Sequence, residues 1–186
     1  MDWFPNDPRG SGSCEIGKPE LRDLGPIHLG RKEDQPTRDE LRAFFRAGEP
    51  LLNHNVVWLD HELRAAVACA FADIIRSHGY TVWACAILRN HAHAVVRTHK
   101  SHNSEQMWHA FAQASAQALR AFPALGTGHP VWSARPYKVY LKSRHAVRTR
   151  IGYVQRNPEK EGLPPQAWDF VSHCPWDVNR ADCEKH

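Results

Sequence analysis

The chain has 186 residues, of which 42% are hydrophobic and 24% charged, values typical of one globular domain with a full hydrophobic core. Its net charge of +4 and isoelectric point of about 8.9 favour polyanionic partners without requiring them. The longest apolar runs fall short of the roughly 20 residues of a membrane span, and five scattered cysteines without a C-x-x-C pair argue against a disulfide framework. Residues 1–5 lack the pattern of a signal peptide. We therefore expect a cytoplasmic protein with free thiols and no membrane association.

The N-terminal quarter of the sequence predicts little regular structure. Residues 1–24 are rich in proline, glycine and charge without a period, and we expect a flexible arm. A short strand is expected at residues 26–30. Thr37 and Glu40 have the spacing of a capping box, so a short helix should begin there and end near Gly48.

The middle of the chain predicts a helix, a hairpin and a second helix. Between residues 60 and 79, apolar side chains recur at helical spacing between an aspartate that can cap the start and a glycine that can end the helix. Residues 80–88 are apolar and rich in strand formers, and residues 91–98 can return antiparallel to them. A further helical pattern follows from residue 104 to residue 122.

The C-terminal third adds one more strand and one more helix. Residues 131–141 have strand character, and residues 144–156 fit a basic helix that should end near Asn157, because Pro158 restricts the residue before it. The element order predicts an α+β, ferredoxin-like fold: an antiparallel sheet with two helices on one face, plus an additional C-terminal helix. We expect this domain to cover residues 25–172, followed by a tail at residues 173–186.

His91 and His93 are the first candidate site residues. Residues two apart on a strand point to the same face, so both imidazoles would project together and could share one metal ion. With 13 histidines in the chain, however, about one such H-x-H pair is expected by chance. On spacing alone, two polar residues on the open face of a sheet are the favoured explanation, because strands commonly have one polar face.

Tyr153 and Asn157 are the second pair of candidates. Four residues apart on a helix, they share a face and would offer a phenol and an amide oxygen to the same neighbour. Taken alone, a core aromatic residue and a helix-ending asparagine are the commoner explanation. Only the conjunction of this pair with the histidine pair indicates chemistry.

The residues Asn90-His91-Ala92-His93 after an apolar strand, then Val131-Trp132, then Tyr153-Val154-x-x-Asn157-Pro158-x-x-x-Gly162, resemble the single-tyrosine transposases of the H-U-H superfamily. The similarity is greatest to the branch with the REP-associated tyrosine transposases, and it covers residues 56–170. The resemblance implies metal ligation by His91, His93 and Asn157, with Mg²⁺ or Mn²⁺ as the cofactor. It further implies attack by Tyr153 on single-stranded or hairpin DNA, through a covalent 5′-phosphotyrosine intermediate. Whether the chain acts as a monomer or a homodimer stays open.

Basic and aromatic side chains around the last predicted strand and helix are candidates for DNA binding. The cations could follow a phosphate backbone while the aromatic rings stack on unpaired bases. A solvated basic helix face is the alternative. The candidates are Trp132, Arg135, Tyr137, Lys138, Lys142, Arg144, Arg148, Arg150 and Arg156.

Two rival interpretations remain. The sequence departs from the family pattern at Leu88 and Arg89, where Met-Pro is usual, and at Ala92, where a bulkier residue is usual. These departures are compatible with a domesticated, catalytically inactive nucleic-acid-binding protein. The other rival is a histidine-rich zinc protein unrelated to nucleic acid. The C-terminal His173, Cys174, Cys183 and His186 do not support a zinc site, because their spacings match no standard one and a frayed tail explains them better.

Overall fold

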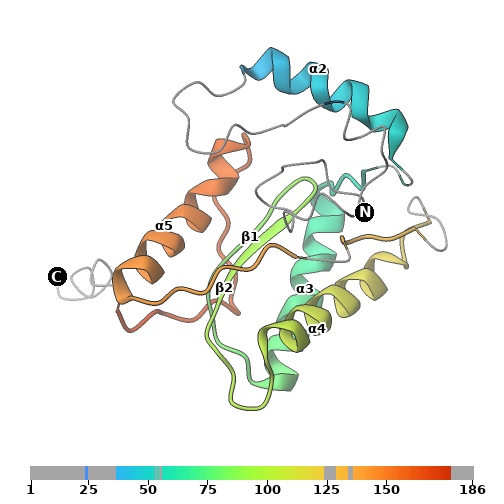
Figure 1. The fold of residues 1–186 in the computed structure, drawn as a ribbon. Helices are drawn as coiled ribbons and strands as arrows, with labels where there is room; N and C mark the ends of the chain where they lie inside the picture. Colours follow the sequence, from blue (N-terminus) through green and yellow to red (C-terminus); the bar gives the residue numbers. More distant parts are fainter. Residues whose placement is uncertain are drawn as a thin grey trace. The chain divides into compact units, whose positions relative to one another are not determined.

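In the computed structural model, residues 24, 37–52, 54, 56–123, 129–133 and 136–176 are described. They form a mixed α/β structure in two compact units, Met1–Val57 with Gly126–Val139 and Trp58–Leu125 with Tyr140–His186. The described part contains four α-helices and one two-stranded antiparallel sheet (Figure 1). The strand expected at residues 26–30, and the arm at residues 1–24 apart from Leu24, lie outside the described residues.

The first unit contains helix α2, Arg38–Gly48, followed by a short 3-10 turn, η1, Glu49–Leu51. The predicted capping box is confirmed. The backbone N–H of Glu40 donates to the Thr37 hydroxyl, and the Glu40 carboxylate accepts from the Thr37 N–H at 2.7 Å. Hydrogen bonds from Thr37 lower the pKa of Glu40, because they favour its charged form.

The second unit begins with helix α3, His61–His78, and the helix predicted between residues 60 and 79 is confirmed. The Asp60 carboxylate caps it by accepting from the Leu63 N–H at 2.9 Å. Gly79 ends it with φ at 68°, a left-handed conformation that glycine adopts without a steric penalty.

Strands β1, Val82–Ile87, and β2, Ala92–Val96, form the predicted antiparallel hairpin. Ala86 pairs with His93 and Ala84 with Val95, and a register irregularity lies between Val82 and Ala84. Directly paired residues project to the same face of a sheet, so His93 and Val95 share a face with the two alanines.

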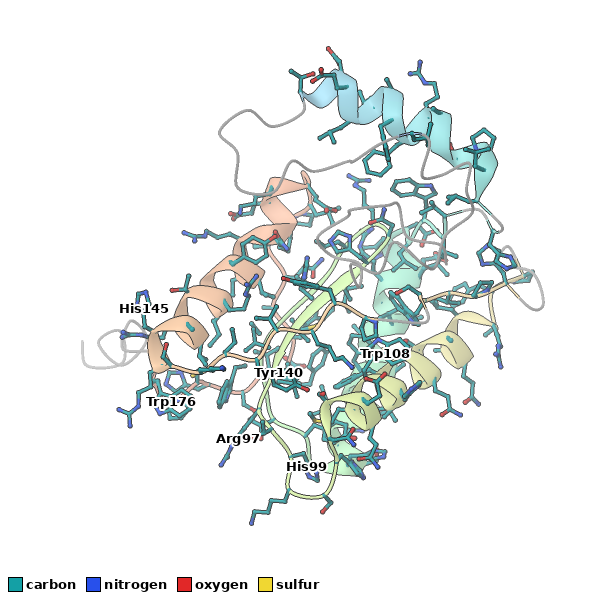
Figure 2. The ribbon with its side chains drawn as sticks, viewed as in Figure 1. Arg97, His99, Trp108, Tyr140, His145 and Trp176 are labelled. Atoms are coloured by element: carbon teal, nitrogen blue, oxygen red, sulfur yellow. The ribbon has the colours of Figure 1, made fainter. Side chains whose placement is uncertain are left out.

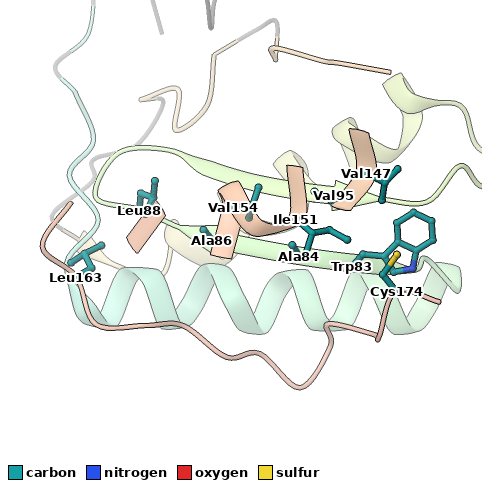
Figure 3. Close-up of a cluster of buried hydrophobic side chains, with 10 residues drawn as sticks. All are labelled: Trp83, Ala84, Ala86, Leu88, Val95, Val147, Ile151, Val154, Leu163 and Cys174. Carbon is teal, nitrogen blue, oxygen red and sulfur yellow. The ribbon is translucent and has the colours of Figure 1, made fainter. Parts of the chain in front are cut away.

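Helices α4, Ser104–Leu119, and α5, Arg144–Lys160, complete this unit. Figure 1 shows α3 and α4 on one side of the hairpin and α5 on the other. The hydrophobic core beneath α5 combines strand, helix and C-terminal residues (Figure 3). It contains Trp83, Ala84, Ala86, Leu88, Val95, Val147, Ile151, Val154, Leu163 and Cys174.

Helix α5 extends to Lys160, so the predicted end near Asn157 is wrong. Pro158 lies inside the last turn, where it removes one backbone hydrogen bond, and its ring is fully buried. The carbonyl of Pro158 accepts from Glu161 at 3.0 Å and from Leu163 at 2.9 Å. Burial and these capping bonds offset the local cost of the proline.

The segment after α5 covers the open edge of β1. The Gln166 side chain accepts from the Ile87 N–H at 2.9 Å and donates to the Ile87 carbonyl at 2.8 Å, as a neighbouring strand would. Further along, the Ser172 N–H donates to the Val82 carbonyl at 2.8 Å. Cys174 is buried in the core and Trp176 packs against it, so the packed chain extends beyond residue 173.

The strand predicted at residues 131–141 does not form in the described residues 131–133 and 136–141. Pro136 lacks an N–H to donate to a sheet. Tyr137 and Val139, which alternate along this segment, are 56% and 46% exposed. The described residues thus show two strands of the predicted sheet. None of the described helices has the length and apolar character that a bilayer crossing requires.

Candidate active site

His91 and His93 lie at the turn end of the hairpin, on the face that α5 covers. The His91 carbonyl accepts from the Leu88 N–H at 2.7 Å, which closes the turn immediately before β2. The two imidazole rings stand edge to face, with centroids 4.8 Å apart. The hairpin register therefore brings both rings to the same point.

The His91 ring is oriented by a neighbour at each nitrogen. Its Nδ1 lies 2.7 Å from the Asn90 amide oxygen, which can only accept, so Nδ1 carries a proton in this pair. Its Nε2 lies 3.8 Å from a carboxylate oxygen of Glu161, just beyond the end of α5. The distance is too long for a hydrogen bond, so the carboxylate acts on the ring only through its negative charge, which favours a cation beside it.

Tyr153 reaches this cluster from α5. Val147, Ile151 and Val154 face the core, so Tyr153 lies at the margin of the helix interface. Its ring centroid is 5.9 Å from that of His93, and 37% of the residue is exposed. The phenol therefore lies beside the histidine pair rather than in the apolar interior.

Two cations flank the Tyr153 ring. The Lys160 ammonium nitrogen lies 4.6 Å from the ring centroid, and the Arg150 guanidinium carbon lies 5.3 Å from it. Both residues belong to α5, one turn before and two turns after the tyrosine. The surroundings of Tyr153 are therefore positively charged.

Asn157 lies one helical turn after Tyr153, as predicted from their spacing, and it is 7% exposed. Its carbonyl accepts from the Glu161 N–H at 3.3 Å, so the same residue anchors the turn that carries Glu161.

Against known proteins, no family model, curated sequence or solved structure matches the chain.

The imidazole pair is the part of this site with metal-binding chemistry. Two adjacent imidazoles are ligands that divalent ions accept. Within the described residues, no three His, Cys, Asp or Glu side chains are placed to hold a metal. The two imidazoles alone would leave most positions of a bound ion to other ligands.

The DNA-binding candidates divide between the two units. Trp132, Tyr137 and Lys138 belong to the first unit and Arg135 lies outside the described residues, so their relation to Tyr153 is not defined. In the second unit, Arg150 contacts the Tyr153 ring. The other basic candidates there are exposed, and they are Lys142, Arg144, Arg148 and Arg156.

The N-terminal end of α5 carries an aromatic and basic group of its own. The Arg144 guanidinium lies 5.8 Å over the Trp176 ring, which contacts the buried Trp83. Figure 2 shows Trp176 and His145 at this end of the helix, away from the hairpin turn. These residues could serve a bound strand but lie apart from the Tyr153 ring.

Sequence reasoning missed Lys160 and Glu161. Lys160 lies seven residues after Tyr153, a spacing that returns to the same helix face, so a longer predicted helix would have indicated it. Glu161 carries no comparable signal, because its approach to His91 depends on the turn after α5.

Proposed function

We propose that this chain is a metal-dependent single-stranded DNA endonuclease and strand transferase of the H-U-H transposase type, acting through a covalent phosphotyrosine. One observation carries the proposal: the partly exposed Tyr153 ring contacts His93, which in turn contacts His91. A phenol and two imidazoles from separate elements thus lie together, which supports these roles.

The reaction needs a nucleophile that water can reach and that can keep the phosphoryl group. The Tyr153 oxygen forms a bond to phosphorus while the bond between phosphorus and the 3′ oxygen breaks. The phenol proton passes to solvent, and the departing 3′ oxygen takes up a proton. A second strand's 3′-hydroxyl can reverse the step, so strands are exchanged rather than hydrolysed.

Mg²⁺ or Mn²⁺ held by His91, His93 and Asn157 would supply positive charge to offset the charge that develops on the phosphate. Asn90 holds the His91 ring in one orientation through Nδ1, which leaves Nε2 directed away from the backbone. Glu161 adds negative charge on that side, which favours a cation there. Arg150 and Lys160 favour an anion at the tyrosine.

The proposed function is combined with a ferredoxin-like fold, a DNA partner and a cytoplasmic location. A ferredoxin-like sheet needs two more strands beside β1 and β2, and residues 26–30 are the remaining candidate among the predicted strands. Single-stranded or hairpin DNA is the proposed substrate, in the cytoplasm, and self-association into a homodimer is compatible with the function. A structure of the complex with hairpin DNA would decide the sheet and the assembly together.

The test is capture of the intermediate. Full-length protein is incubated with end-labelled single-stranded hairpin DNA and Mg²⁺ or Mn²⁺, and a covalent adduct is sought by denaturing electrophoresis. Tyr153→Phe should abolish the adduct, with the loss exceeding about 1,000-fold because no nucleophile remains. Tyr140→Phe removes the hydroxyl of another exposed tyrosine and should leave the adduct intact. Equal adduct from wild type and Tyr153→Phe overturns the proposal.

A catalytically inactive nucleic-acid-binding protein is the second candidate. The cations flanking Tyr153 favour it as well, because they can hold a strand without any covalent step. Binding that weakens steeply with salt, with no adduct from any hairpin or metal, would select this alternative.

A further inference from the structure

The two cations at Tyr153 have no carboxylate partners in the described part of the chain. The ion pairs found there join Arg42 to Asp39, Arg76 to Asp73, His91 to Glu161 and His109 to Glu105. Neither Arg150 nor Lys160 takes part in any of them. Two like charges near one ring repel each other, so an anion near both of them lowers the energy of the arrangement.

The Arg150 and Lys160 cations both lie close to the Tyr153 ring. Contacts of a cation with an exposed aromatic ring are weak, too weak to collect two cations for stability alone. The ring also lies edge to face with His93, with centroids 5.9 Å apart. The cations therefore lie around the phenol, which is the group that must meet an anion.

We propose that Arg150 and Lys160 form a binding site for one phosphate group beside the Tyr153 hydroxyl. This inference rests on the proposed function for the identity of the phosphate, which is the scissile phosphodiester of a single strand. Arginine can bind two phosphate oxygens at once, whereas lysine acts as a point charge that adapts to its position. Together they would hold phosphorus within reach of the phenol oxygen and offset charge during attack.

Affinity measurements test the site without any reaction. In full-length Tyr153→Phe protein, which cannot cut, we compare Lys160→Gln with Lys100→Gln, an exposed lysine elsewhere in the same unit. Loss of one phosphate contact should reduce the slope of log affinity against log salt by about 0.7 for a single strand. Arg150→Gln should do the same, with Arg120→Gln as its control. Equal slopes for Lys160→Gln and Lys100→Gln overturn the phosphate site.

Single-turnover kinetics add a second readout in protein that retains Tyr153. At saturating DNA, Lys160→Gln should form adduct about tenfold more slowly than Lys100→Gln, because charge stabilisation at the phosphate is lost. An adduct in wild type with equal rates and slopes for both variants overturns this inference alone. No adduct from wild type, with the slope difference retained, overturns the strand-transfer activity alone.

Inorganic phosphate distinguishes the two possible sources of the ligand. Competition by millimolar phosphate against the oligonucleotide, weakened by Lys160→Gln but not by Lys100→Gln, supports a site for the phosphate group itself. A slope difference without such competition supports recognition of the phosphate as part of a strand. Failure of wild type to bind either ligand overturns the site and the proposed function together.

Discussion

Two clusters in the second unit combine imidazoles with a tyrosine, at opposite ends of the same hairpin. At the turn end, His91 and His93 lie beside Tyr153. At the other end, where β1 begins and β2 has ended, histidines surround a different tyrosine at centroid distances of 5.2–5.6 Å. This Tyr80 cluster consists of His78, Tyr80, His99 and His102.

The two clusters differ in exposure and in how their polar atoms are used. Tyr80 is 5% exposed, and its hydroxyl lies 2.7 Å from the Nδ1 of His102. The Nδ1 of His99 accepts from the Ser101 N–H, which leaves the proton of the neutral ring on Nε2 and removes the lone pair that a metal needs. Tyr153, in contrast, is 37% exposed and faces two cations. Proximity of histidine to tyrosine therefore does not indicate chemistry; accessibility and local charge do.

Matched histidine variants should separate the clusters most strongly. His93→Ala should reduce adduct formation at least about 100-fold, because the offset of phosphate charge is worth several kcal/mol. His102→Ala should leave the adduct rate unchanged below the melting temperature. It should lower the free energy of unfolding by about 1–3 kcal/mol, since the buried Tyr80 hydroxyl loses its partner.

The measurements are single-turnover adduct formation and urea unfolding of the same two proteins. If His102→Ala reduced adduct formation as much as His93→Ala, the distinction between an open, reactive cluster and a closed, structural one would be wrong.

Local signals in the sequence predicted most elements of the second unit. Helix α3 followed from its cap and its stop, and the hairpin followed from two apolar runs around a polar turn. The shared face of His91 and His93 required only the two-residue period of a strand. These features depend on neighbouring residues, which the sequence displays directly.

Features that depend on tertiary packing were not predicted. Gln166 forms hydrogen bonds with the backbone of Ile87 in β1, 79 residues away in the sequence, and no local pattern indicates this contact. The extension of α5 past Pro158 depends on burial of the proline, which overrides its usual effect. The approach of Glu161 to His91 follows from that extension, so the sequence did not indicate Glu161 as a residue of the site.

Removal of the Glu161 charge should weaken metal binding at the cluster of His91, His93 and Tyr153. We expect Glu161→Gln to weaken Mn²⁺ binding about tenfold, at the low end of the range for groups that support metal ligands, because the side chain is one-third exposed. Glu159→Gln, an exposed neighbour on α5, should have no effect. Isothermal titration calorimetry measures the Mn²⁺ affinity of both variants. Equal affinities of Glu161→Gln and Glu159→Gln would show that Glu161 serves only as an ion-pair partner of His91.

Alkaline pH should lower the free energy of unfolding through the buried Cys85 and Tyr80, an effect smaller than those of the substitutions above. Burial raises the pKa of the Cys85 thiol to about 12, whereas Cys69 is exposed. A thiol whose folded pKa lies above its unfolded value contributes stability that is complete below the unfolded pKa, near 9, and is lost as pH rises towards 12. By pH 9.5 the loss should reach about 0.8 kcal/mol. Burial also raises the pKa of Tyr80, which extends the decline above pH 10.

Cys85→Ala should flatten the fall in unfolding free energy between pH 8 and 9.5, and Cys69→Ala should not. An equally steep fall in Cys85→Ala and wild type would mean that water reaches this side of the hairpin as readily as it reaches Tyr153.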